Sequence, residues 1–206
     1  GGVGAPGCKR PRGRRVGYAE GKGHGHDIGA RPDIRPELAS MVTLVMGLSV
    51  AKAIGSLYPV SVGIKWPNDV VVNGKKICGI LTEMSAEMTG IHYLVIGTGI
   101  NTNVEEFPEE IQSVATSLIK ELGEKVNRAE LIAACLKYFE EYYEKYIAAG
   151  NLAPLKEDYE ALLLNRNNKV RVLEPNHEYT GLSLGINEDG ELLVKKEDGT
   201  VTAVYA

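Results

Sequence analysis

The chain has 206 residues, of which 44% are hydrophobic and 24% charged, and its formal net charge is −4 at pH 7. This length suffices for one domain, or for one medium domain and a small one. The acidic balance provides no basic face for nucleic acid, and no apolar run is long enough to span a bilayer. Its three cysteines, Cys8, Cys78 and Cys135, form no CxxC pair. We therefore expect reduced thiols in a cytoplasmic protein that binds neither DNA nor membranes.

Residues 1–30 differ in composition from the rest, because ten of them are glycine and arginines are frequent. Such a segment lacks the apolar periodicity of a folded element, so we expect a loop or a disordered basic end without a strand between 23 and 30. Arg12 and Arg14, on either side of Gly13, would be able to close over an anion such as a phosphate. His24 and His26 lack further ligands at suitable spacing, so no metal site is expected.

Pro36 begins an apolar segment with three-four spacing, which predicts a helix buried on most sides and ended by Gly55. Strands of an antiparallel meander are expected next, at 60–64, 69–72, 76–83 and 93–100. Asn73-Gly74 joins two of them and is a strong hairpin signal, because a type I′ turn needs positive φ at both positions. Thr89-Gly90 indicates another turn. We expect a helix to pack on one face of this sheet.

Asn127 and Glu130 have the spacing of a capping box, which predicts a helix from there to about Gly150. Pro154 begins a short helix through Leu164. Beyond it, strands are expected at 169–173, 181–186, 191–196 and 200–204, with Asp-Gly turns at 189–190 and 198–199. The pattern therefore predicts three parts: a Gly/Arg-rich segment (1–30), an α+β domain (31–164) and a small barrel-like β domain (165–206), apparently truncated.

Residues 65–69, Lys-Trp-Pro-Asn-Asp, place the only tryptophan beside an amide and a carboxylate, between two expected strands. Asn68 and Asp69 follow a proline that fixes the local backbone, which is typical of an Asx turn entering a strand. Alternatively, the carboxylate accepts a proton from an incoming amine or holds a metal ion near phosphates. Trp66 is either part of the core or a cover for a flat ligand.

Lys76 stands where the third expected strand begins. Such a lysine is usually solvated, but at this border it can project into a cleft, where its ammonium is a point charge for a carboxylate or phosphate. Lys75 is the competing candidate and the one expected to be exposed. Gly97 and Gly99 weaken a strand interior, which indicates close approach of a ligand or another backbone. Asn101 after them is suited to hydrogen-bond an adenine or ribose edge.

Taken together, these motifs resemble the catalytic core of the biotin protein ligases. The resemblance covers about residues 31–206 and rests on five successive motifs, which are residues 65–69, 74–83, 97–101 and 115–118 and the β-rich tail. It implies an α+β fold like that of biotin ligases and class II synthetases, with a mixed sheet, packed helices and an SH3-like C-terminal domain.

The resemblance also implies an ATP-dependent reaction in two steps, assisted by Mg²⁺. The carboxylate of biotin attacks the α-phosphate of ATP to give biotinyl-5′-AMP, and a lysine of a biotin carboxyl carrier protein then takes the acyl group. Lys76 would stabilise charge in both steps and Asp69 would steer or deprotonate the acceptor amine. The residues implied to bind biotin or the adenylate are Lys76, Gly79, Asn101, Trp66, Asn68, Arg12, Gly13 and Arg14.

The first thirty residues depart from the family pattern. Residues 9–18 lack the tryptophan and Ser-Pro of its Gly/Arg loop, and its first strand, which holds the ureido ring of biotin, has no counterpart. Translation out of frame would explain this, and the coding DNA tests the idea. Two alternatives to a biotin ligase are a lipoate-ligase-like adenylating enzyme and a non-catalytic fragment that acts as a carrier-docking or dimer scaffold. A homodimer is possible under any of these interpretations.

Overall fold

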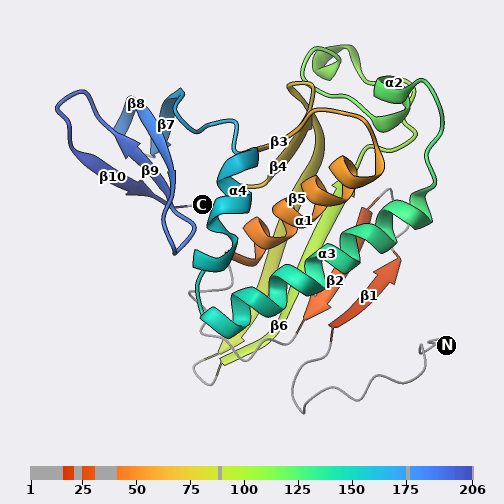
Figure 1. Ribbon diagram of the computed structural model, residues 1–206, viewed down its shortest axis with the longest axis horizontal. Coiled ribbons are helices and arrows are strands. Elements are labelled where there is room, and N and C mark those ends of the chain that lie inside the picture. Colours follow the sequence, from red (N-terminus) through yellow and green to blue (C-terminus); the bar gives the residue numbers. More distant parts are fainter. Residues whose placement is uncertain (1–15, 21–24, 31–40, 88–89, 175–176, 206) are drawn as a thin grey trace.

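The computed structural model describes residues 16–20, 25–30, 41–87, 90–174 and 177–205, and it contains two antiparallel sheets. The larger sheet has the strand order β1-β2-β6-β5-β4-β3 and the smaller one β10-β9-β8-β7, and Figure 1 shows the smaller sheet in blue at one side. The strands of the larger sheet are β1 (Val16–Glu20), β2 (Gly25–Ala30), β3 (Val62–Lys65), β4 (Asp69–Val72), β5 (Lys75–Glu87) and β6 (Gly90–Ile100). Those of the smaller sheet are β7 (Lys169–Glu174), β8 (His177–Ile186), β9 (Leu192–Lys195) and β10 (Val201–Val204). The α+β class and the C-terminal β unit are thereby confirmed.

The helices cover one face of the larger sheet, with α1 lying between the sheet and α3 (Figure 1). They are α1 (Met41–Leu57), α2 (Leu118–Leu122), α3 (Arg128–Ala149) and α4 (Lys156–Leu162), with 3₁₀ turns at Glu109–Ile111 and Ala153–Leu155. Because α1 packs on two sides, it is apolar nearly all round. The expectation that Gly55 ends it was wrong. Ile54 is fully buried, and packing of this kind outweighs the roughly 1 kcal/mol helix penalty of a glycine, so α1 continues to Leu57.

The expectation of no strand between 23 and 30 was also wrong. β2 pairs antiparallel with β6 along its whole length, with Ile28 opposite Ile96 and Gly25 opposite Gly99, and β1 pairs with β2. Because ladder hydrogen bonds come from the backbone, a neighbouring strand can recruit a glycine-rich segment of low β propensity. Arg12, Gly13 and Arg14 lie outside the described residues, as does Thr89 of the second expected turn.

The predicted meander of β3 to β6 is confirmed, as is its first hairpin, in which Asn73 and Gly74 have φ of 51° and 79°. The pairings between these strands are antiparallel. Parallel contacts occur as two isolated bridges, Ile64 with Leu163 and Lys76 with Ala115. Among the described residues, these two bridges are the parallel pairings that accompany the antiparallel ladders.

The ends of α3 also agree with the sequence. The Asn127 side chain accepts hydrogen bonds from the backbone N–H groups of Ala129 and Glu130, at 3.1 and 3.4 Å, so Asn127 is the N-cap. Gly150 ends the helix with φ of 71°, and its N–H bonds to the carbonyl of Tyr146.

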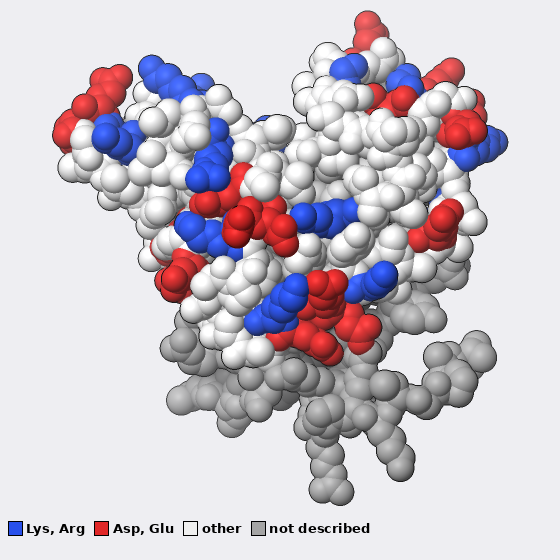
Figure 2. Space-filling model, viewed as in Figure 1, with Lys and Arg blue, Asp and Glu red and all other residues white. Residues whose placement is uncertain are grey.

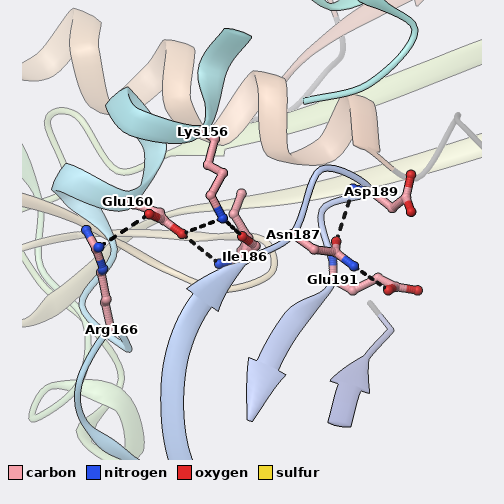
Figure 3. A network of polar contacts seen from close by, with 7 residues as sticks. All are labelled: Lys156, Glu160, Arg166, Ile186, Asn187, Asp189 and Glu191. Carbon is pink, nitrogen blue, oxygen red and sulfur yellow. Dashed lines mark hydrogen bonds and ion pairs between the residues drawn. The ribbon is translucent and has the colours of Figure 1, made fainter. Parts of the chain in front are cut away.

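A nearly buried carboxylate joins the two sheets through α4. The side chain of Glu160 is 10% exposed, and its Oε1 accepts a hydrogen bond from the backbone N–H of Ile186 in β8 at 3.1 Å (Figure 3). Lys156 and Arg166 pair with the same carboxylate at 3.1 and 3.5 Å. Gly185, with φ of 119°, leaves the space that the carboxylate occupies, since a Cβ there would lie 2.2 Å from Oε1. The smaller sheet is therefore docked on the larger unit through specific polar contacts.

Replacing Glu160 with alanine is expected to lower the free energy of unfolding by about 1–3 kcal/mol, because the N–H of Ile186 loses its partner. Thermal and urea denaturation measure this change. The exposed Glu157 on the same helix is the matched control, and its replacement by alanine should change stability by less than about 0.5 kcal/mol. Equal effects of the two changes would contradict a docking role for Glu160.

Candidate active site

Lys76 and Asp69 meet on the face of the larger sheet opposite α1. The Nζ of Lys76 lies 2.6 Å from Oδ1 of Asp69, and the two side chains are 49% and 20% exposed. Asp69 stands opposite Gly79, which stands opposite Gly99, so the three residues form one row across β4, β5 and β6. Directly opposite residues share a face of a sheet, so the ion pair lies at one end of a row of glycines.

Gly79 makes room for the lysine side chain. A Cβ at residue 79 would lie 3.3 Å from both Cε and Nζ of Lys76 and 3.9 Å from Oδ1 of Asp69. The ammonium therefore lies directly over the backbone of β5, and any larger residue at 79 would crowd it. This explains why the motif has glycine between two buried residues, Cys78 and Ile80.

A β-bulge directs Lys76 to this face. Val70 of β4 pairs with Cys78, but the next residue, Val71, pairs with Lys76, so Ile77 is the extra residue. In a regular strand Lys76 would share the face of Cys78 and enter the core, since side chains alternate. The bulge turns the strand locally and brings the lysine out beside Gly79, while Ile77 and Cys78 both stay buried.

Part of the face beyond the ion pair is exposed. Leu81 and Tyr93, on the same face of β5 and β6, are 65% and 49% exposed, whereas Ile80 and Thr98 on the other face are nearly buried beneath the helices. Gly97 and Gly99 of β6 also belong to this face and contribute no side chains to it. A ligand can therefore lie flat on β5 and β6, with its anionic end at the ammonium of Lys76.

Two predicted site residues, Asn68 and Asn101, hold the backbone around the ion pair. The side-chain amide of Asn68 donates to the backbone carbonyl of Ile80 at 3.0 Å, and the backbone carbonyl of Asn68 accepts from the Ile80 N–H at 3.0 Å. The Asn101 amide donates to the carbonyl of Thr116 at 3.1 Å. The contacts to an adenylate expected of these side chains stay predictions.

Trp66 points towards the smaller sheet. Its indole N–H donates to the carbonyl of Gly190 in the β8–β9 turn at 3.0 Å, and its backbone N–H donates to the side chain of Asn165 at 3.1 Å. The ring is partly buried against the core, as one of the two interpretations expected. Trp66 therefore ties the loop that carries Asn68 and Asp69 to the C-terminal unit, a role that residue spacing does not indicate.

Neither of the described cysteines is placed to act as a nucleophile. Cys78 is 1% exposed, and burial, together with Cys135 and Asp69, raises its pKa. Burial likewise raises the pKa of Cys135 to about 12. Both stay protonated thiols near neutral pH and behave as small apolar core residues. The chemistry of the site therefore falls to the exposed ammonium of Lys76 and the partly buried carboxylate of Asp69.

Charge is distributed evenly over the face that carries α3. Figure 2 shows cations and carboxylates side by side there, in agreement with ion pairs such as Lys52 with Asp158 and Lys145 with Glu141. Within the described ranges, no three His, Cys, Asp or Glu side chains come together as a metal ligand set. In that same part of the chain, no helix combines the length and the apolarity needed to cross a bilayer.

Comparison with known proteins assigns this arrangement to a family. Residues 28–161 match the model of the Biotin/lipoate A/B protein ligase family, and residues 167–206 match that of the Biotin protein ligase C terminal domain. The chain belongs to the biotin/lipoate A/B protein ligase family. The resemblance drawn from residues 65–69 and the motifs after them is thereby confirmed.

The chain is also similar to proteins that are named as ligases. The chain is 37% identical over 189 residues to the bifunctional ligase/repressor BirA of Bacillus subtilis, covering 91% of this chain and 58% of the relative. It is 32% identical over 174 residues to the biotin–[acetyl-CoA-carboxylase] ligase of Mycobacterium tuberculosis, covering 82% and 62%. The chain thus spans less than two thirds of each relative. The structure of the Aquifex aeolicus biotin protein ligase in complex with biotin and ATP superposes with a TM-score of 0.74 at 30% identity, covering 89% of this chain and 76% of that one.

Proposed function

We propose that this family member is an ATP-dependent ligase that forms biotinyl-5′-AMP and transfers biotin to a lysine of a biotin carboxyl carrier protein. The observation that carries the proposal is the ammonium of Lys76, held over Gly79 and 2.6 Å from Asp69 at the end of an open, glycine-lined face. The Aquifex aeolicus relative, which was solved with biotin and ATP, supports the same substrates.

In the first step, a biotin carboxylate oxygen attacks the α-phosphate, and the bond to the leaving pyrophosphate breaks. Negative charge grows on the phosphate oxygens as they become equatorial, and the ammonium of Lys76 is placed to stabilise it. Mg²⁺ would arrive bound to the ATP phosphates and supply further positive charge. Asp69 would be a carboxylate near these phosphates, but its 2.6 Å ion pair with Lys76 makes it a poor metal ligand before substrate binds.

In the second step, the carrier lysine attacks the biotinyl carbonyl carbon and AMP leaves. The attacking amine must lose a proton, and Asp69 is the nearby carboxylate that can accept it once Lys76 has turned to the adenylate. Gly79 would line the biotin site, and Asn68, Asn101 and Trp66 would form its frame. Arg12, Gly13 and Arg14 stay assigned to the phosphate loop as a prediction from the sequence.

Two alternatives are less well supported. A lipoate-ligase-like enzyme shares the catalytic family model, but residues 167–206 match a domain described for biotin protein ligases. A non-catalytic scaffold would not need a lysine turned out of the core by a bulge onto a glycine surface. Homodimer formation and a cytoplasmic location remain predictions.

The test is direct assay of both steps with the full chain. Incubation with biotin, Mg²⁺ and ATP should release pyrophosphate in one burst. After addition of a biotin carboxyl carrier domain, pyrophosphate release should continue, and the mass of the carrier should rise by one biotinyl group. Lipoate in place of biotin is the control. Turnover with lipoate alone would support the lipoate alternative, and failure to bind biotin or its adenylate would support the scaffold.

A further inference from the structure

The backbone of Lys76 is held from outside the sheet. Its N–H donates to the carbonyl of Val114 at 2.8 Å, and its carbonyl accepts from the N–H of Thr116 at 2.9 Å. The pairing of β5 with β6 begins at Cys78, opposite Ile100, so Lys76 extends beyond the end of β6, and residues 114–116 lie beside it as a short substitute strand through a parallel bridge at Ala115. The position of the lysine therefore depends on where this segment lies.

A single carboxylate fixes that segment to the hairpin before Lys76. Glu121, on α2, accepts a hydrogen bond at Oε1 from the hydroxyl of Thr116 at 2.5 Å. Its Oε2 accepts a hydrogen bond from the side-chain amide of Asn73 at 2.6 Å. Thr116 is 2% exposed, so its bond to Glu121 is partly shielded from water, whereas the bond from Asn73 is exposed. Asn73 occupies the first central position of the type I′ turn. Figure 1 shows α2 over this end of the sheet.

We propose that Glu121 is a positioning residue for Lys76, which rests on the role that the proposed function gives to that lysine. One oxygen of Glu121 holds the segment bonded to the lysine backbone, and the other holds the turn three residues before it. Together they fix the bulge that directs the ammonium over Gly79. A displacement of about 1 Å in a positioning element can cost on the order of 100-fold in rate.

The first test measures backbone protection in the absence of substrate. Amide hydrogen exchange of Lys76 and Thr116 should become at least 10-fold faster in Glu121→Ala, while the amide of Ile96, in the centre of β6, should be unaffected. Glu124→Ala, at an exposed position just after α2, is the matched control and should leave all three rates unchanged. Unchanged exchange of Lys76 and Thr116 in Glu121→Ala would overturn the proposal whether or not the protein is a ligase.

The second test asks whether Glu121 acts through Lys76. The Kd of a non-hydrolysable biotinyl-adenylate analogue should rise about 10-fold in Glu121→Ala. In a protein that already carries Lys76→Ala, adding Glu121→Ala should raise the Kd little further. Glu121→Gln should restore most of the affinity, since its carbonyl can accept from Asn73 and its amide can donate to the Thr116 hydroxyl. An equal loss of affinity on Glu121→Ala in the wild-type and Lys76→Ala backgrounds would overturn the proposal. Failure of the wild-type protein to bind the analogue would instead count against the proposed function.

Discussion

Replacing Lys76 with alanine is expected to slow formation of biotinyl-5′-AMP by about 10²–10³-fold, the usual cost of removing one preorganised group that stabilises transition-state charge. Its side chain is 49% exposed, and its Cε and Nζ lie over Gly79 of its own strand. Pyrophosphate release under single-turnover conditions measures the rate, and thermal denaturation should show a nearly unchanged melting temperature.

Lys75→Ala is the matched control, because it removes an equal charge from the preceding exposed residue of β5 and should leave the rate within about twofold. Lys76→Arg separates charge from shape. A guanidinium keeps the charge but is larger than an ammonium, which already lies 3.3 Å from where a Cβ of residue 79 would stand, so recovery should be partial. An unchanged rate in Lys76→Ala would remove Lys76 from the mechanism.

Replacing Asp69 with asparagine is expected to slow transfer to the carrier by about 10²–10⁴-fold, the range for loss of a general base. The size and shape of the side chain are kept, so the row with Gly79 and Gly99 should persist. Preformed adenylate mixed with excess carrier, followed by intact-mass spectrometry, isolates this second step.

Adenylate formation in Asp69→Asn should fall much less than transfer. The ammonium of Lys76 loses its 2.6 Å partner but keeps its place over Gly79. A fall confined to the first step would mean that Asp69 orients the lysine and takes no proton from the acceptor amine. Equal losses in both steps would point to the same orienting role.

Features that depend on local residue chemistry follow from the sequence. The Asn73-Gly74 turn, the Asn127 cap and the end of α3 at Gly150 all lie where turn and capping chemistry predicts them. The Lys76–Asp69 pair was predicted as two separate candidates. Both were named because charged residues at the borders of apolar strands point to a site.

Features that depend on partners distant in the chain were missed. β2 forms because β6 supplies its hydrogen bonds, which the composition of residues 25–30 does not indicate. The bulge at Ile77 depends on the pairing register of β4 and β5, so alternation alone would have placed Lys76 in the core. Trp66 was interpreted as a core residue or as a cover for a ligand, and neither interpretation indicates that its indole N–H donates to the carbonyl of Gly190, 124 residues later.

The side chains of the motif at residues 65–69 consequently point towards two different parts of the molecule. Trp66 faces the C-terminal sheet, while Asn68 and Asp69 face β5 and the open surface. Because Glu160 also docks that sheet, the C-terminal unit helps to fix the loop that carries the candidate base. The spacing in the sequence indicates that these residues belong to one motif. The folded chain shows that they contact different elements.

A crystal structure with a bound non-hydrolysable biotinyl-adenylate analogue tests the central claim most directly. The Nζ of Lys76 should then lie within about 3 Å of an oxygen at the junction of the acyl and phosphate groups. The ligand should lie along β5 and β6 over Gly79 and Gly99. An analogue bound elsewhere, or a Lys76 ammonium turned to bulk solvent beside an occupied site, would contradict the account.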